Sequence, residues 1–146
     1  MNWFFKSTPT YKYISFDNIV KIVNTNNNYK SVLLINTMNI LEQSILIKLT
    51  TIATDEEHEI EKLIDIGDFY HTIFIYGKNN LDISVNNKYD QLIGLGFINV
   101  YIYGAGMFEW LLLRDIYGDD NFPITTTQPN NTFNILTYKS TLTLIN

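Results

Sequence analysis

The chain has 146 residues, 46% of them hydrophobic, and a net charge of −5 at pH 7. This length fits one domain with a buried core, and the acidic charge argues against a general affinity for nucleic acid or an anionic membrane, since both need clustered Lys and Arg. The chain contains no cysteine, which excludes disulfides, thiolate metal sites and thiol chemistry.

Three parts are predicted along the chain: an aromatic arm at residues 1–12, a core at 13–122 and a tail rich in Thr and Asn at 123–146. The core is expected to begin with a short strand at 13–15. A helix is predicted at about 16–23, because apolar residues recur there at the spacing of one helix face.

The next predicted strand is the continuous apolar run 31–36, which suits a strand covered on both faces. A short helix is expected at 40–45 and a short strand at 49–52. A capping-box pattern begins at Thr54 and predicts a helix that stops at Gly67.

The second half of the core is predicted to contain a strand at 72–76, a helix at 83–95 and a strand at 98–103, which together form a βαβ unit. A last helix is expected at 107–116. Alternating strands and helices indicate the α/β class, with a small, mainly parallel sheet of about five strands flanked by helices.

The order of elements from residue 72 to residue 124 resembles the second half of a rhodanese-like domain. Residues 95–100, Leu-Gly-Phe-Ile-Asn-Val, are similar to the family's G-F-x-N-V segment before the last strand. Residues 105–110, Ala-Gly-Met-Phe-Glu-Trp, are similar to its glycine turn followed by Trp, and Phe122-Pro123 resembles its closing aromatic-Pro pair. The resemblance implies a rhodanese-like fold over about residues 18–123.

The residues that the family uses for catalysis are changed in this chain. By the resemblance, the loop after strand 72–76 would carry a nucleophilic Cys, and Gly77 stands at that position. In the active pattern an Arg closes this loop, and this chain has Asp82 there. In the first half of the domain, Asn36 replaces an acidic residue of the family. Glu42 matches a family Glu. Sulfur transfer and the related phosphatase chemistry both need a thiolate. We therefore expect a catalytically silent member of the family.

The degenerate active-site loop is the candidate site. Its residues are Gly77, Lys78, Asn79, Asn80, Leu81 and Asp82. One interpretation is anion binding, in which Lys78 and the loop amides hold a sulfate or phosphate at the start of the next helix. The other is an Asn-rich turn in which Asp82 caps that helix and repels anions.

No metal and no cofactor are expected. His58 and His71 are the only histidines, and thiolates are lacking, whereas a metal site needs three or four convergent ligands. We expect His58 to be solvated on an acidic helix and His71 to be partly packed.

Two terminal segments are candidates for contact with another chain. Aromatic residues near the N-terminus must pack on their own domain or on a partner. In the tail, residues 133–138 and 141–145 have the pattern of edge strands, which can pair with another chain. The interaction candidates are Trp3, Phe4, Phe5, Phe133, Ile135 and Tyr138.

These patterns favour a protein-interaction or structural module that self-associates or binds a protein partner, with no nucleic acid and no membrane as partner. The alternative is a sulfurtransferase- or phosphatase-related enzyme that works without a loop cysteine, or an anion-binding module. The lack of cysteine and of a signal sequence favours an intracellular, reducing compartment. Residues 108–113 and 115–118 are similar to rhodanese-like proteins of large DNA viruses, for which the host cytoplasm or the virion is expected.

Overall fold

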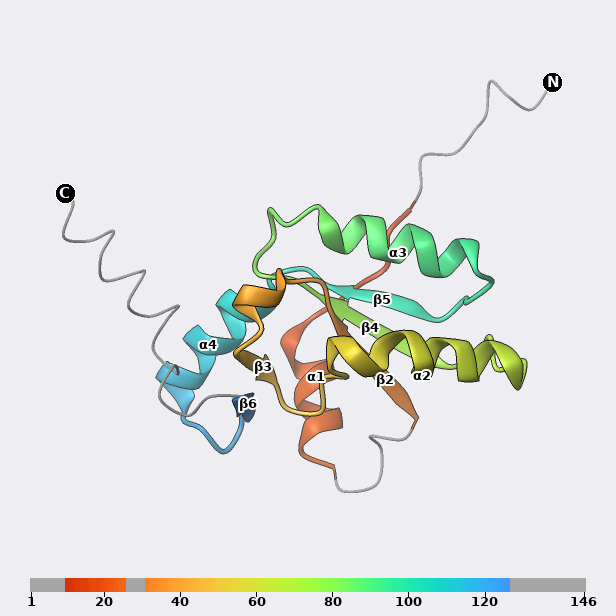
Figure 1. The fold of residues 1–146 in the computed structure, drawn as a ribbon. Helices are drawn as coiled ribbons and strands as arrows, with labels where there is room; N and C mark the ends of the chain where they lie inside the picture. The colour runs from red at the N-terminus through yellow and green to blue at the C-terminus, as the bar shows by residue number, and fades with distance from the viewer. Residues whose placement is uncertain (1–9, 26–30, 127–146) are drawn as a thin grey trace.

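The computed structural model describes residues 10–25 and 31–126 (Figure 1). Helices and strands alternate through most of this part. They are β1 (Tyr13–Ile14), α1 (Phe16–Val23), β2 (Val32–Asn36), the 3₁₀ helix η2 (Ile40–Glu42), β3 (Ile45–Ile47), α2 (Ala53–Asp65), β4 (Thr72–Tyr76), α3 (Ser84–Gly94), β5 (Val100–Tyr103), α4 (Gly106–Tyr117) and β6 (Ile124–Thr126).

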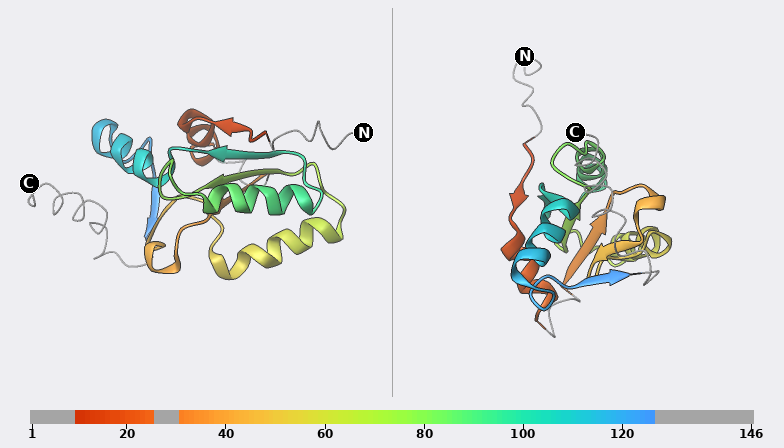
Figure 2. Two further views of the ribbon diagram at one scale, coloured as in Figure 1. Left: turned by 90° about the horizontal axis from the view of Figure 1, so that it is seen from above. Right: turned by 90° about the vertical axis from the view of Figure 1, so that its left-hand side faces the viewer.

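The central sheet contains four parallel strands in the order β1-β5-β4-β2. In the register of β4, Ile75 pairs with Ile35 of β2 on one side and with Ile102 of β5 on the other. Figure 2 shows helices on both faces of this sheet. The fold is therefore α/β with a parallel sheet, as the sequence predicts.

The sheet has a hydrophobic core on each face, because successive side chains of a strand point to opposite faces. Leu34 and Phe74 pack with residues of α1 and α4. Leu33 and Ile73 pack with residues of α2 and α3. The apolar run of β2 is thus covered on both faces, which confirms that prediction.

The sheet has one strand fewer, among the described residues, than the five predicted. The predicted strand at 49–52 is reduced to a single bridge between Thr50 and Leu34, with the Thr51 N–H donating to the Leu34 carbonyl at 2.8 Å. Leu49 has a φ of 74°, which an extended strand does not permit. The strand breaks at this residue.

A second, two-stranded sheet was not predicted. The short helix expected at 40–45 is present as the 3₁₀ helix η2, which ends at Glu42. The unpredicted strand β3 follows it and pairs antiparallel with β6, which lies in the segment expected to be the tail. The helix predicted to start at Thr54 begins at Ala53, after Ile52, so the capping box is not used as expected. Gly67 does end this region with a left-handed φ of 74°.

Candidate functional site

The candidate loop, residues 77–82, joins the carboxyl end of β4 to α3. Because β4 lies between β2 and β5, the segments that follow all three strands meet at this edge of the sheet. The Thr37 N–H, just after β2, donates to the Tyr76 carbonyl at 2.9 Å, and the Met107 N–H, after β5, donates to the Gly77 carbonyl at 2.9 Å. The fold therefore places the loop where ligands of open parallel sheets bind.

Gly77 is buried and has no room for a side chain. A Cβ on this residue would lie 2.5 Å from Oδ2 of Asp82 and 2.7 Å from Cγ2 of Val85. Contacts this short require both neighbours to move. The position that would carry a nucleophile in the family is thus closed by other side chains of the same loop and helix.

Asp82 turns its carboxylate back into the loop. Its Oδ2 accepts the Lys78 N–H at 3.2 Å, and its Oδ1 accepts the Ser84 N–H at 3.1 Å. The Ser84 hydroxyl also bonds Oδ1 and lies 2.8 Å from Oγ1 of Thr37. Asp82 therefore provides the negative group that these two amides bind, in addition to capping the start of α3.

The turn within the loop is closed by Asn79. The side-chain oxygen of Asn79 accepts the Leu81 N–H at 3.0 Å, and the Asn79 carbonyl accepts the Asp82 N–H at 3.2 Å. Asn80 is exposed. These internal bonds occupy further amides that the anion-binding interpretation would need.

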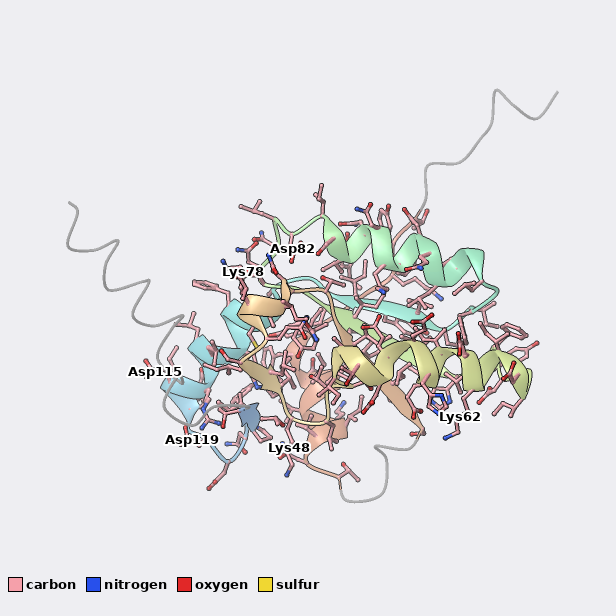
Figure 3. All side chains as sticks on the ribbon, viewed as in Figure 1. Lys48, Lys62, Lys78, Asp82, Asp115 and Asp119 are labelled. Atoms are coloured by element: carbon pink, nitrogen blue, oxygen red, sulfur yellow. The ribbon has the colours of Figure 1, made fainter. Side chains whose placement is uncertain are left out.

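Lys78 points toward η2 and pairs with Glu42 at 2.7 Å, as the closeness of Lys78 and Asp82 to η2 in Figure 3 illustrates. Both side chains are partly exposed, so the pair adds little to stability. Beside it is an open depression of about 550 Å³, lined by Thr37, Met38, Asn39, Glu42, Lys78, Asn79, Leu81, Asp82 and Ser84. Glu42 partly neutralises the cation that would have attracted an anion to this depression.

The glycine turn before α4 is fitted to the candidate loop. Gly106 has a φ of 65°, and a Cβ there would lie only 2.4 Å from the Gly77 carbonyl oxygen. The first amides of α4, on Met107 and Phe108, donate to the carbonyls of Gly77 and Lys78, both at 2.9 Å. Two of the N–H groups that a helix start leaves without intrahelical partners are therefore bonded to the loop.

Two residues next to the glycine turn have structural partners. Trp110 is fully buried, and its indole N–H donates to the Pro123 carbonyl at 3.2 Å. The carboxylate of Glu109 accepts the Tyr103 hydroxyl at 2.8 Å. Burial, with a smaller contribution from Glu109, raises the pKa of Tyr103.

Tyr76, the last residue of β4, links the two sheets, which no sequence pattern predicts. Its buried hydroxyl accepts the Ile47 N–H at 3.1 Å and lies 2.6 Å from Oγ1 of Thr50. Burial raises the pKa of Tyr76. A single Tyr at a strand end gives no sequence signal for such a link between the two sheets.

The two histidines do not meet. His58 is exposed on α2, and Nδ1 of His71 lies 3.2 Å from Oδ2 of Asp68. Within residues 10–25 and 31–126, no group of three or more His, Cys, Asp or Glu side chains is arranged to hold a metal ion. None of the helices in the same ranges is long and apolar enough to cross a membrane.

The interaction candidates Trp3, Phe4, Phe5, Phe133, Ile135 and Tyr138 lie outside the described residues. The last residues of the predicted arm lie on the domain. The Tyr11 hydroxyl donates to Asp90 at 3.1 Å, and its ring packs edge-on against Tyr89 with centroids 5.1 Å apart.

Comparison with solved structures agrees with this fold. The Alr3790 protein from Anabaena sp. superposes with a TM-score of 0.57 at 14% identity, covering 83% of this chain and 98% of that one. The Saccharomyces cerevisiae single domain sulfurtransferase RDL2 gives 0.53 at 15%, covering 73% and 93%. Ygr203w, a yeast protein tyrosine phosphatase of the rhodanese family, gives 0.50 at 12%, covering 85% and 98%. No protein-family model and no curated protein matches the sequence.

These neighbours show that the chain has the rhodanese-like fold, as its sequence motifs predict. At sequence identities of 12–15%, this similarity establishes the fold but not the function. Function depends on the residues of the site. At the position where the motif resemblance expects the nucleophile, this chain has Gly77, and no cysteine exists elsewhere to replace it.

Proposed function

We propose that this chain is a catalytically silent rhodanese-like domain that acts as a protein-interaction or structural module. The observation that supports silence is the pair Gly77 and Asp82. The first removes the nucleophile, and the second fills the loop with a carboxylate bound to the Lys78 and Ser84 amides. Sulfur transfer and phosphatase chemistry through this loop would need both a thiolate and those amides.

Anion binding by the intact loop is the weaker candidate. An incoming sulfate or phosphate would have to displace the Asp82 carboxylate from two amides and break the Lys78–Glu42 pair. The negative charge of Asp82 also opposes a second anion at short range.

The rival enzyme would need a nucleophile other than a thiol. Ser84, the first residue of α3, has a hydroxyl beside the Asp82 carboxylate, and its hydrogen bonds to Asp82 and Thr37 fit a structural role. Assays of sulfur transfer from thiosulfate to cyanide, and of p-nitrophenyl phosphate hydrolysis, separate the two proposals. We expect rates equal to the blank. Turnover that Ser84→Ala or Asp82→Ala abolishes would establish the enzyme instead.

We further propose that the module self-associates, with the aromatic residues Trp3, Phe4 and Phe5 as one candidate contact. The support is their sequence pattern. Light scattering on the full chain and on a chain lacking residues 1–8 tests it. A lower mass for the shortened chain is expected, and a monomer mass for both would reject self-association through this segment.

A further inference from the structure

The helices α2 and α3 lie side by side on one face of the sheet (Figure 2), and both pack on the same hydrophobic core. Between them runs a groove of about 480 Å³, which we call the α2–α3 groove. It is bordered by α2 from Ala53 to Ile64 and by α3 from Lys88 to its C-cap Leu95. At a rise of about 1.5 Å per residue, the α2 side of the groove is roughly 17 Å long, or about three helical turns.

The floor of the groove is apolar. Ile60 and Ile64, one turn apart on α2, line it together with Leu92 and Leu95. Leu92 is fully buried, the two isoleucines are half-buried, and Leu95 is 43% exposed. The apolar surface that these side chains leave uncovered faces one groove, and a partner that covers it is stabilised by removing that surface from water.

The rim of the groove is acidic. Lys88 of α3 pairs with Glu56 of α2 at 2.7 Å, with the two side chains 25% and 14% exposed, so the charge of this lysine is neutralised. Glu57 and Glu61 also line the groove, are exposed, and form no ion pair within the part of the chain that the structure describes. The groove therefore presents net negative charge beside an apolar floor.

Charge complementarity selects the partner of such a groove. A helix with apolar side chains at positions i, i+3, i+4 and i+7 can fill the floor, while Lys or Arg side chains beside them reach Glu57 and Glu61. Packing of helix ridges into the grooves of neighbouring helices favours a helix as the occupant. The same carboxylates repel nucleic acid and anionic membranes.

We propose that the α2–α3 groove binds a basic amphipathic helix of a partner protein. This inference gives the proposed interaction module a surface and a partner chemistry, and in that respect it rests on the proposed function. It does not depend on the inactivity of the candidate loop or on self-association through the N-terminal aromatic residues, because no groove residue belongs to residues 77–82 or 1–12.

A fluorescein-labelled synthetic peptide serves as the probe. It has about 14 residues, with Leu at positions i, i+3, i+4 and i+7 and with Lys and Ala elsewhere. Its binding to the full chain is followed by fluorescence anisotropy at physiological salt, and a second peptide carries Glu in place of each Lys. We expect saturable binding of the basic peptide and none of the acidic peptide. The absence of saturable binding of the basic peptide, or equal binding of both, would overturn the proposal.

Two double variants separate the groove from the general acidity of the protein. Glu57→Lys with Glu61→Lys reverses the rim, whereas Glu59→Lys with Asp65→Lys makes the same change of net charge on the same helix outside the groove. The rim variant should weaken binding of the basic peptide at least about tenfold, and the control should weaken it less than about threefold. Equal weakening by the two variants contradicts binding in the groove.

Leu95→Ser tests the apolar floor. Its matched control is Ile93→Ser, since the two side chains are 43% and 40% exposed and only Leu95 lines the groove. Leu95→Ser should weaken binding at least about fivefold, and Ile93→Ser should leave it unchanged. Equal affinities of the two variants would reject the floor as a contact.

Light scattering on the same two variants tests the other occupant, a second copy of the chain. A mass that falls from dimer to monomer in Leu95→Ser but not in Ile93→Ser would overturn the proposal and assign the groove to a second copy. Failure of the groove proposal leaves the results of the enzyme assays and of the 1–8 deletion unchanged, so it is distinguishable from failure of the proposed function.

Discussion

The carboxylate of Asp82 occupies the space that a side chain on residue 77 would need. Its Oδ2 would lie 2.5 Å from a Cβ on Gly77, and the same oxygen accepts the Lys78 N–H at 3.2 Å. The glycine and the inward carboxylate therefore depend on each other. With any larger residue at 77, the carboxylate loses its place, and the two amides it bonds lose their acceptor.

This relationship predicts energetic coupling between the two residues. Gly77→Ala should lower the free energy of unfolding by about 1–3 kcal/mol, because the new methyl group overlaps Asp82 and Val85. Asp82→Ala should cost about 1–2 kcal/mol through the lost acceptor. The double variant should be less destabilised than the sum by at least about 0.5 kcal/mol. Urea denaturation of the four proteins measures this, and additive effects would show that the two side-chain positions do not compete.

The glycine turn gives a prediction with an internal control. Gly106→Ala should destabilise by more than about 3 kcal/mol, because a Cβ there meets the Gly77 carbonyl at 2.4 Å and the residue has a left-handed φ. Gly94→Ala, near the end of α3, meets nothing within 4 Å and should stabilise by up to about 1 kcal/mol. Thermal or urea unfolding distinguishes them, and equal effects would exclude the close approach of the loop to α4.

The elements around the site follow from local sequence signals. β4, α3 and α4 have continuous or periodic apolar residues, and Gly67 ends the preceding region with the φ that favours glycine. The candidate loop therefore lies between a strand and a helix that the sequence predicts.

The errors have a different origin. β3 and β6 are three residues long, and they pair over a separation of about 80 residues, so neither has a local pattern strong enough to predict it. Leu49 breaks the expected fifth strand with a φ that its residue type does not suggest. The carboxylate of Asp82 points into the loop because Gly77 leaves space for it. The spacing of residues along the sequence does not reveal such a packing contact.

The two buried tyrosines predict a loss of stability at high pH. Burial raises the pKa of Tyr76 and of Tyr103 above the ordinary value of 10.0. Above pH 10 the unfolded chain releases protons that the folded chain retains, so the free energy of unfolding falls as pH rises toward the folded-state pKa values. The slope is up to about 1.4 kcal/mol per pH unit for each tyrosine.

Tyr103→Phe should flatten this slope, since it removes one of the two groups. Tyr70→Phe, at a residue that is 73% exposed, serves as the control. Its free energy of unfolding should fall with pH at the same slope as that of the wild type. Urea unfolding between about pH 9 and pH 11 measures both. If Tyr103→Phe keeps the full slope, the ring is not shielded from water in the folded protein.

The central claim is that Asp82 takes the place of an external anion at the amides of the loop. Titration with phosphate, followed by the amide resonances of Lys78 and Ser84, tests it most directly. We predict no saturable shift of these resonances in the wild type and a saturable shift in Asp82→Ala, whose amides lack the carboxylate. Saturable binding in the wild type, with an affinity equal to that of Asp82→Ala, would contradict the account.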